Sequence, residues 1–132
     1  MKKIIINTQQ NKQIIDITKL IEQELPSTGG LCNLLVLHTT AALTTADLDP
    51  GTDLDMLDAF VEMVPKLNYR HPHNPDHVPD HIMSSIIGPQ LLLPFDEGKL
   101  ILGMWQRVIV VELDGPRKRE IILSIIEAEG SN

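Results

Sequence analysis

The stretch LCNLLVLH, residues 31–38, does most to decide the fold of this chain. Its apolar run has the length of a β-strand, since helices ordinarily need about ten residues or more. A nearly continuous apolar run predicts a central strand that is covered on both of its faces. The run closes on His38, which places an imidazole ring at the end of a buried strand. We therefore expect a sheet to be built around this segment and polar chemistry to begin where it stops.

Other short runs rich in Ile, Val and Leu predict the strands that surround this one. Three pairs of runs are separated by brief polar or Gly-containing turns, which predicts three hairpins. The paired runs are residues 4–8 with 13–17, 91–95 with 99–102, and 107–113 with 118–126. Residues 39–47 are rich in Thr and Ala, and we interpret them as the end of one strand and the start of another.

Three helices are predicted from apolar spacing and from their start and stop signals. They cover residues 18–25, the segment between Asp53 and Pro65, and residues 79–87. Thr18 is expected to cap the first helix, and Thr52 or Asp53 the second. Pro79 stands at a favoured position in the first turn of the third helix.

These elements predict an α+β fold, with largely antiparallel sheets and about three helices packed against them. Most neighbouring strands are joined by short turns, which argues against a βαβ array. The 132 residues fit one ordinary domain, and no linker or repeat interrupts them. Residues 1–132 are therefore expected to form a single domain.

Composition limits the partners that such a domain can bind. The formal charge is −7 and aromatic residues make up 3% of the chain, which disfavours nucleic-acid binding by basic surfaces or stacking platforms. No apolar stretch approaches the roughly 20 residues of a membrane span, and the apolar run after the basic pair at the start is too short for a signal peptide. The single Cys32 lies in an apolar run and is expected to be an inert core residue. It suits a reducing compartment, so we expect a cytoplasmic protein with no nucleic-acid or membrane partner.

Histidines carry the most suggestive chemistry. One is His38, and the other four lie in or directly after the polar, Pro-containing stretch 68–80: His71, His73, His77 and His81. A loop of that length is usually functional or mobile. Neutral imidazole binds divalent metals and titrates near neutrality, so a cluster predicts metal binding or acid–base chemistry. Spacing alone equally allows a solvated loop, because there is no His-Glu-x-x-His motif and no Cys pair.

Carboxylates and a tryptophan are further candidates. Asp47 follows His38 closely and could supply a carboxylate to the same pocket, as could Asp49 and Asp53. Aspartates are also common in loops and at helix N-termini, so the simpler interpretation stays open. Trp105 and Gln106 come shortly after a glycine that permits close backbone approach, although a tryptophan here is more often a packing residue.

The basic run at residues 117–119 follows a predicted turn. It is too short for a nucleic-acid footprint. Arg117 or Arg119 could still hold one phosphate group, because a guanidinium matches phosphate geometry with two parallel hydrogen bonds.

Several motifs occur in the order that is typical of one protein family. They are His38-Thr39-Thr40-Ala41-Ala42-Leu43-Thr44, Asp49-Pro50, Tyr69-Arg70-His71, His81-Ile82 with Ser84-Ser85, Gly103-Met104-Trp105-Gln106, and Glu112-Leu113-Asp114-Gly115-Pro116-Arg117. Each motif is weak alone, but the ordered set, which spans about residues 33–119, is specific. In this set the chain resembles the YjbQ/UPF0047 family closely.

The resemblance implies a compact α+β fold that assembles as a homotrimer, with sites near subunit interfaces. Family members are often described as secondary thiamine-phosphate synthases, which join an aminopyrimidine diphosphate to a thiazole phosphate and release pyrophosphate. Some members are described as metal-binding. His38, His71 and His81 match the family pattern, whereas His73 and His77 lie in its variable loop.

Two functions remain open at this point. The first is a metal-assisted transferase for a phosphorylated small molecule, using a divalent ion such as zinc or magnesium. The second is a non-catalytic trimeric protein that binds a metal or a metabolite. The expected residues are His38, His71 and His81 for metal binding and catalysis, Asp47 for catalysis, and Trp105, Gln106, Arg117 and Arg119 for ligand or cofactor contacts. Asp47 stands where the family often has a glutamate, so a shorter carboxylate would have to take that role.

Overall fold

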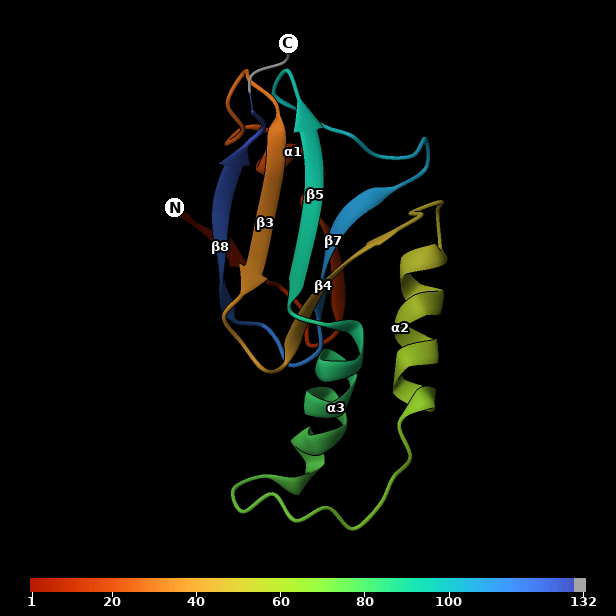
Figure 1. Cartoon of the computed structure of the whole chain (residues 1–132). Helices are drawn as coiled ribbons and strands as arrows, with labels where there is room; N and C mark the ends of the chain where they lie inside the picture. Colours follow the sequence, from red (N-terminus) through yellow and green to blue (C-terminus); the bar gives the residue numbers. More distant parts are fainter. Residues whose placement is uncertain (130–132) are drawn as a thin grey trace.

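The computed structural model describes residues 1–129. This part of the chain forms strands, helices and one short 3-10 turn, arranged as Figure 1 shows. In chain order the elements are β1 (Lys2–Asn7), β2 (Gln13–Asp16), α1 (Thr18–Glu22), β3 (Gly30–Val36), β4 (Ala41–Ala46), α2 (Thr52–Met63), η1 (Pro75–His77), α3 (Val78–Ile87), β5 (Gln90–Asp96), β6 (Lys99–Leu100), β7 (Arg107–Glu112) and β8 (Lys118–Glu127).

The strands form two antiparallel sheets. The larger sheet has five strands in the order β1-β8-β3-β5-β6, and the smaller has three in the order β2-β7-β4. Every pairing in both sheets is antiparallel. The predicted α+β class, with antiparallel sheets and three α-helices, is confirmed for the described residues.

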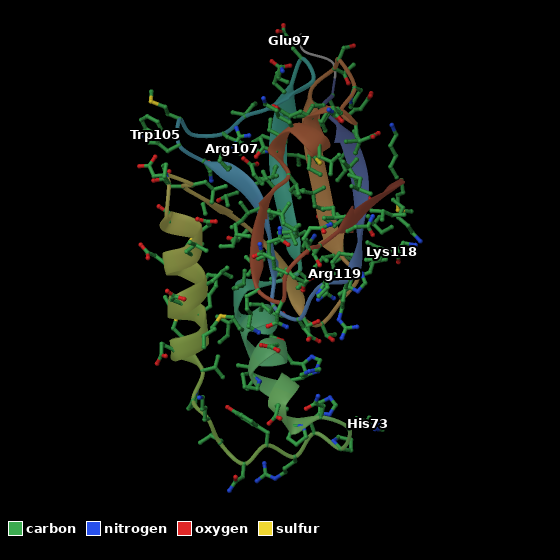
Figure 2. The ribbon with its side chains drawn as sticks, turned by 180° about the vertical axis from the view of Figure 1, so that it is seen from behind. His73, Glu97, Trp105, Arg107, Lys118 and Arg119 are labelled. Atoms are coloured by element: carbon green, nitrogen blue, oxygen red, sulfur yellow. The ribbon has the colours of Figure 1, made fainter. Side chains whose placement is uncertain are left out.

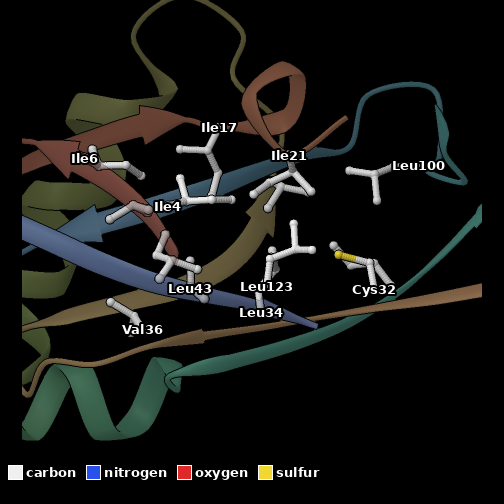
Figure 3. Packing of buried hydrophobic residues seen from close by; sticks show 14 of the residues in the cluster. Ile4, Ile6, Ile17, Ile21, Cys32, Leu34, Val36, Leu43, Leu100 and Leu123 are labelled. Carbon is white, nitrogen blue, oxygen red and sulfur yellow. The ribbon is translucent and has the colours of Figure 1, made fainter. Parts of the chain in front are cut away.

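The main hydrophobic core lies between the two sheets (Figure 3). Leu34 and Leu123 face inward from the larger sheet, and Leu43 and Val110 meet them from the smaller one. Successive side chains of a strand point to opposite faces, so every second residue of these strands points into the core between the two sheets. Cys32 lies in the same cluster, where burial raises the pKa of its thiol to about 11. This environment agrees with the prediction of an inert core cysteine.

A second core lies on the other face of the smaller sheet. Along β7, Ile109 and Val111 alternate with Val108 and Val110, whose side chains belong to the first core. Ile109 and Val111 pack against Leu57 of α2 and Met83 of α3. The two helices therefore cover the three-stranded sheet, as Figure 1 shows. The molecule is layered as five-stranded sheet, three-stranded sheet and helices.

Strand β3 is covered on one face in the single chain, so the prediction of two covered faces was wrong. Cys32, Leu34 and Val36 are buried, whereas Leu31 and Leu35 keep 38% and 37% of their surface exposed. The apolar run conceals this alternation because its outward positions are leucines as well. No described element lies over the outer face of the five-stranded sheet.

Two of the three predicted hairpins were also wrong. The strand β1 pairs with β8, and β2 pairs with β7, so the first pair of runs is divided between the two sheets. The same holds for β7 and β8. Each short link therefore crosses between sheets instead of turning within one. The remaining predicted hairpin, residues 91–95 with 99–102, is confirmed, with Phe95 opposite Leu100 across the turn at residues 97–98.

The two crossing links hold each other in place. The amide of Thr8 donates to the carbonyl of Arg117 at 2.9 Å, and the amide of Gly115 donates to the carbonyl of Asn11 at 2.9 Å. These long-range bonds satisfy backbone groups that a local hairpin would have paired.

The helices begin and end close to the predicted residues, but the predicted caps were wrong. Helix α1 ends at Glu22, and the Thr18 side chain contacts Asp16 and Val108 without capping it. The N-cap of α2 is Gly51, with φ of 92°, and neither predicted residue caps it. The third helix begins at Val78, with Pro79 in its first turn.

Within residues 1–129, no helix is both long and apolar enough to cross a membrane.

Candidate functional site

A cleft of about 680 Å³ opens at one end of the molecule. The loop after β3, the start of α3, the link between β7 and β8, and the first residues of β8 meet there. Its lining residues are Leu37, His38, Thr39, Thr40, His77, His81, Asp114, Arg117, Lys118 and Arg119. The lining has three permanent cations and one carboxylate, although the chain as a whole carries a charge of −7.

His38 is held by the backbone of the neighbouring strand. Its Nε2 accepts a hydrogen bond from the amide of Glu120 at 2.9 Å. A neutral His38 therefore carries its proton on Nδ1, which can donate to a ligand. Burial lowers the pKa of His38, and the positive charge of Arg119 lowers the pKa further. These effects favour the neutral ring near pH 7.

His81 projects from α3 towards the loop that follows β3. Its Nδ1 lies 3.2 Å from the carbonyl oxygen of Thr39, so this nitrogen must carry the proton for the bond to form. The neutral ring then has a free lone pair on Nε2. That nitrogen can accept or, once protonated, donate a proton in the cleft.

His71 lies beside the cleft but does not line it. Its Nδ1 accepts from the amides of His73 and Asn74, at 3.2 and 3.1 Å, and so closes a local turn. Its ring stacks on His81, with ring centroids 5.4 Å apart and planes at 12°. His71 therefore touches the site through His81.

His77 lines the cleft, although the family resemblance places it in a variable loop and not among the site residues. Its Nδ1 lies 3.6 Å from Oδ2 of Asp114. One signal could have found it: His77 and His81 are four residues apart, the spacing that places two side chains on one face of a helix. The turn η1 continues directly into α3, so this helical relationship applies.

Arg117 and Lys118 form the exposed basic wall of the cleft. Their side chains are 51% and 60% exposed. Arg117 donates from Nε to the carbonyl of Asp114 at 2.7 Å and from one terminal nitrogen to its carboxylate at 2.9 Å. A guanidinium has five N–H donors, so others remain for a ligand.

Arg119 is buried behind that wall and is engaged by Glu112. Nε donates to Oε1 of Glu112 at 2.8 Å, and a terminal nitrogen contacts Oε2 and also donates to Oγ1 of Thr40 at 2.9 Å. Burial alone would raise the pKa of Glu112, but hydrogen bonds from Arg119, the Asp114 amide and Thr8 outweigh burial and hold this pKa below its ordinary value. Arg119 is thus a structural part of the wall in this chain.

Three of the predicted site residues lie at the opposite end of β4. Asp47 and Trp105 line a separate pocket of about 260 Å³. Trp105 is 69% exposed, so it does not have the packing role that its position suggested. Gln106 donates to Oγ1 of Thr45 at 2.9 Å, which ties its loop to β4. Figure 2 shows Trp105 far from Arg119, and within one chain the structure does not bring this group to the histidines.

The donor arrangement of the single chain does not fit the expected divalent ion. Across residues 1–129, no three His, Cys, Asp or Glu side chains are grouped as metal ligands. Backbone amides already occupy Nε2 of His38 and Nδ1 of His71. Of the predicted metal-binding set, only His71 and His81 lie in contact.

The fold and the cleft define a small two-sheet α+β protein with a basic, histidine-lined pocket. A family model described as "UPF0047 protein YjbQ-like" matches residues 2–128. A UPF0047 protein from Archaeoglobus fulgidus is 32% identical over 125 residues, which cover 94% of this chain and 99% of that protein. The UPF0047 protein YjbQ from Salmonella typhimurium is 38% identical over 120 residues, which cover 86% and 85%.

Solved structures with the same fold are also similar to this chain in sequence. A conserved hypothetical protein from Thermus thermophilus has a TM-score of 0.87 and 32% identity, and the match covers 96% of this chain and 100% of that one. A protein of unknown function from Sulfolobus solfataricus, described as YbjQ-like, has a TM-score of 0.87 and 31% identity, with 96% of each chain covered. The chain belongs to the YjbQ/UPF0047 family, as the ordered motifs predicted.

Proposed function

We propose that this chain binds a phosphorylated small molecule in the basic cleft. The observation that carries the proposal is that Arg117 and Lys118 line one cavity together with His77 and His81 in a strongly acidic chain. Cations gathered in a cleft attract anions even when the net charge of the protein is negative. Imidazole and guanidinium groups also donate hydrogen bonds to phosphate oxygens.

Arg117 and Lys118 are the proposed phosphate contacts. Both side chains are largely exposed, and Arg117 has donors that Asp114 does not use. Arg119 has a different proposed role, because Glu112 and Thr40 already hold its guanidinium. It supports the wall and adds a positive charge behind it.

The reaction proposed for this site is the one that the family resemblance implies. An aminopyrimidine diphosphate is joined to a thiazole phosphate, and pyrophosphate leaves. In this proposal the basic wall stabilises the charge that develops on the departing pyrophosphate, an effect that is strong when the donors are already in place. His81, protonated on Nε2, donates a proton to the leaving group, while His38 donates a hydrogen bond from Nδ1.

A divalent metal ion and a homotrimer remain predictions from the resemblance. The proposed reaction assigns no step to a metal, because in the part of the chain that the structure describes no three His, Cys, Asp or Glu side chains are grouped as ligands. Metal analysis of the purified protein, with titration of zinc and magnesium, tests the first prediction.

Turnover of the two thiamine precursors by the purified protein tests the proposal. Wild type is expected to form product, and His81→Asn is expected to lose most of this activity while it remains folded. His73→Asn is the matched control, since His73 lies in the preceding loop and does not line the cleft. Equal product from wild type and His81→Asn would contradict the assigned role. Thermal protection by pyrophosphate without any product would instead support the non-catalytic binding protein.

A further inference from the structure

Besides His38 and His81, the cleft is lined by a third histidine, His77, to which the proposed reaction assigns no step. We infer that His77 determines specificity, by contacting the second phosphate of a diphosphate-bearing ligand whose first phosphate lies on Arg117 and Lys118. This inference rests on the proposed function, since it requires that the cleft binds phosphate.

The position of His77 is fixed by local structure. Pro75 starts the 3-10 turn, and the Asn74 side chain accepts a hydrogen bond from the Asp76 amide at 3.1 Å. The amide of His77 donates to the carbonyl of Asn74 at 3.2 Å, and the chain continues into α3 at Val78. A ring carried by a capped turn is presented to a ligand at little entropic cost.

Asp114 lies beside both Arg117 and His77. Its Oδ2 is 2.9 Å from a terminal nitrogen of Arg117 and 3.6 Å from Nδ1 of His77. The same carboxylate holds Arg117 and attracts the ring of His77. It therefore keeps the His77 ring and the Arg117 guanidinium close to each other in the cleft.

The size of the cleft favours a ligand longer than one phosphate. Its volume of about 680 Å³ equals that of roughly twenty water molecules at about 30 Å³ each. In that space a diphosphate can set one phosphate against Arg117 and Lys118 and its second phosphate beside His77. His77 is then the residue that distinguishes the longer anion from the shorter one.

Calorimetric titration with two anions, pyrophosphate and orthophosphate, tests this inference. His77→Ala is expected to weaken pyrophosphate binding roughly tenfold, the effect of losing one hydrogen bond to a charged group. Its affinity for orthophosphate is expected to stay within about twofold of wild type, because the basic wall is intact. His73→Ala, the matched control in the preceding loop, should leave both affinities unchanged.

The titrations separate a failure of the role of His77 from a failure of the proposed function. Equal weakening of both anions by His77→Ala, or no weakening of either, overturns the role of His77 while the proposed function stands. If wild type binds neither anion, the proposed function itself fails. His77→Gln keeps a side-chain N–H donor and guards against a folding defect in the alanine variant. Its pyrophosphate affinity should lie between those of wild type and His77→Ala.

Discussion

Arg119 lies on strand β8, two residues after Arg117, yet the two side chains have different environments. Arg117 is exposed at the cleft, whereas Arg119 is 2% exposed and bonded to Glu112, which is 0% exposed. Oγ1 of Thr8 donates to the same carboxylate at 2.7 Å. The ends of β1, β7 and β8 are therefore joined by one buried polar network, which shapes the wall of the site.

Glu112→Gln should destabilise the protein strongly. The change removes the charge that compensates Arg119 and leaves a buried, unpaired guanidinium, which typically costs about 3–5 kcal/mol. Urea unfolding followed by circular dichroism measures this change in the free energy of unfolding.

Glu120→Gln is the matched control for that measurement. Glu120 is on the same strand as Arg119, but its contacts with Lys3 and Lys118 are long, at 3.7 and 3.9 Å, and solvent-exposed. Such pairs contribute at most about 1 kcal/mol. Similar losses for Glu112→Gln and Glu120→Gln would contradict a special role for the buried pair.

The stability of the protein should fall as the pH is lowered from neutrality, partly because of His38. The folded pKa of His38 lies below its ordinary value of 6.5, so the unfolded chain binds more protons between these two values. Stability from this group is complete above about pH 6.5 and decreases as pH falls through the folded pKa. The lowered pKa of Glu112 adds a second loss below its ordinary value of 4.5.

Urea midpoints measured at a series of pH values test this behaviour, with His38→Asn as the comparison. The asparagine variant has no titrating ring, so its stability should change less than that of wild type just below about pH 6.5. The further decrease below about pH 4.5 should remain in both proteins, because Glu112 is unchanged. An equal slope in the upper range would show that His38 is not responsible.

The link between β7 and β8 depends on Gly115. A Cβ at this position would collide with the carbonyl oxygen of Gln10 and would lie 2.8 Å from Oγ1 of Thr8. Both contacts belong to the packed crossing links, so they have little room to move. Gly115→Ala should therefore lower the melting temperature by several degrees, which corresponds to a loss of roughly 1–3 kcal/mol.

Gly103→Ala provides the control for Gly115→Ala. A Cβ at Gly103 would lie 3.6 Å from the nearest atom, a side-chain oxygen of Gln106, which is an ordinary contact. Differential scanning calorimetry should show a melting temperature close to that of wild type for Gly103→Ala. A comparable loss in both variants would mean that close packing of the link is not the cause.

Strands and helices were predictable because their signals are local. Apolar runs located seven of the strands in the described residues to within a few residues, and proline marked the end of α2 and the first turn of α3. Strand β4 lies in the Thr- and Ala-rich segment 39–47, which predicted only the end of one strand and the start of another. The partners of the strands were less predictable. Short links usually make hairpins, and nothing in residues 8–12 or 113–117 indicates that the chain changes sheets there. The change of sheet at these links depends on the apolar faces of the two sheets packing against each other, which is a property of the whole chain.

The candidate site was predictable in part for the same reason. His38, His81 and Arg117 meet in the cleft because they lie at strand and helix ends that converge. Burial of Arg119 depends on a carboxylate from another strand, Glu112, and no sequence spacing reveals that pairing. Asp47 is near His38 in sequence, but β4 carries the chain away to the other end of the molecule.

At the scale of the whole molecule, the uncovered outer face of the five-stranded sheet is the main unexplained surface. Leu31, Leu35, Leu92 and Ile126 are between 37% and 57% exposed there. Adjacent strands bring them close together, with Leu31 opposite Ile126 across β3 and β8. Contiguous apolar patches of this kind often mark protein–protein contacts. The patch is a candidate contact surface for the homotrimer that the family resemblance predicts.

Leu35→Asp should weaken that assembly, because a carboxylate in the centre of an apolar contact loses its hydration without a partner. Sedimentation velocity at equal concentrations should give about three times the 14.7 kDa chain mass for wild type and a shift towards a single chain for the variant. Leu54→Asp, on the exposed side of α2, is the control and should sediment like wild type. A monomeric wild type would contradict the homotrimer.

In the proposed function, the basic cleft binds a phosphorylated ligand through Arg117. Titration of pyrophosphate into wild type, Arg117→Gln and Arg107→Gln tests it most directly. Arg107 is paired with Asp16 at the opposite end of the molecule, 2.8 Å from Nε to Oδ2, so its variant controls for loss of one positive charge. The proposal predicts saturable binding by wild type and Arg107→Gln, and affinity at least about tenfold weaker for Arg117→Gln. Equal affinity in all three proteins, or no binding by wild type, would contradict it.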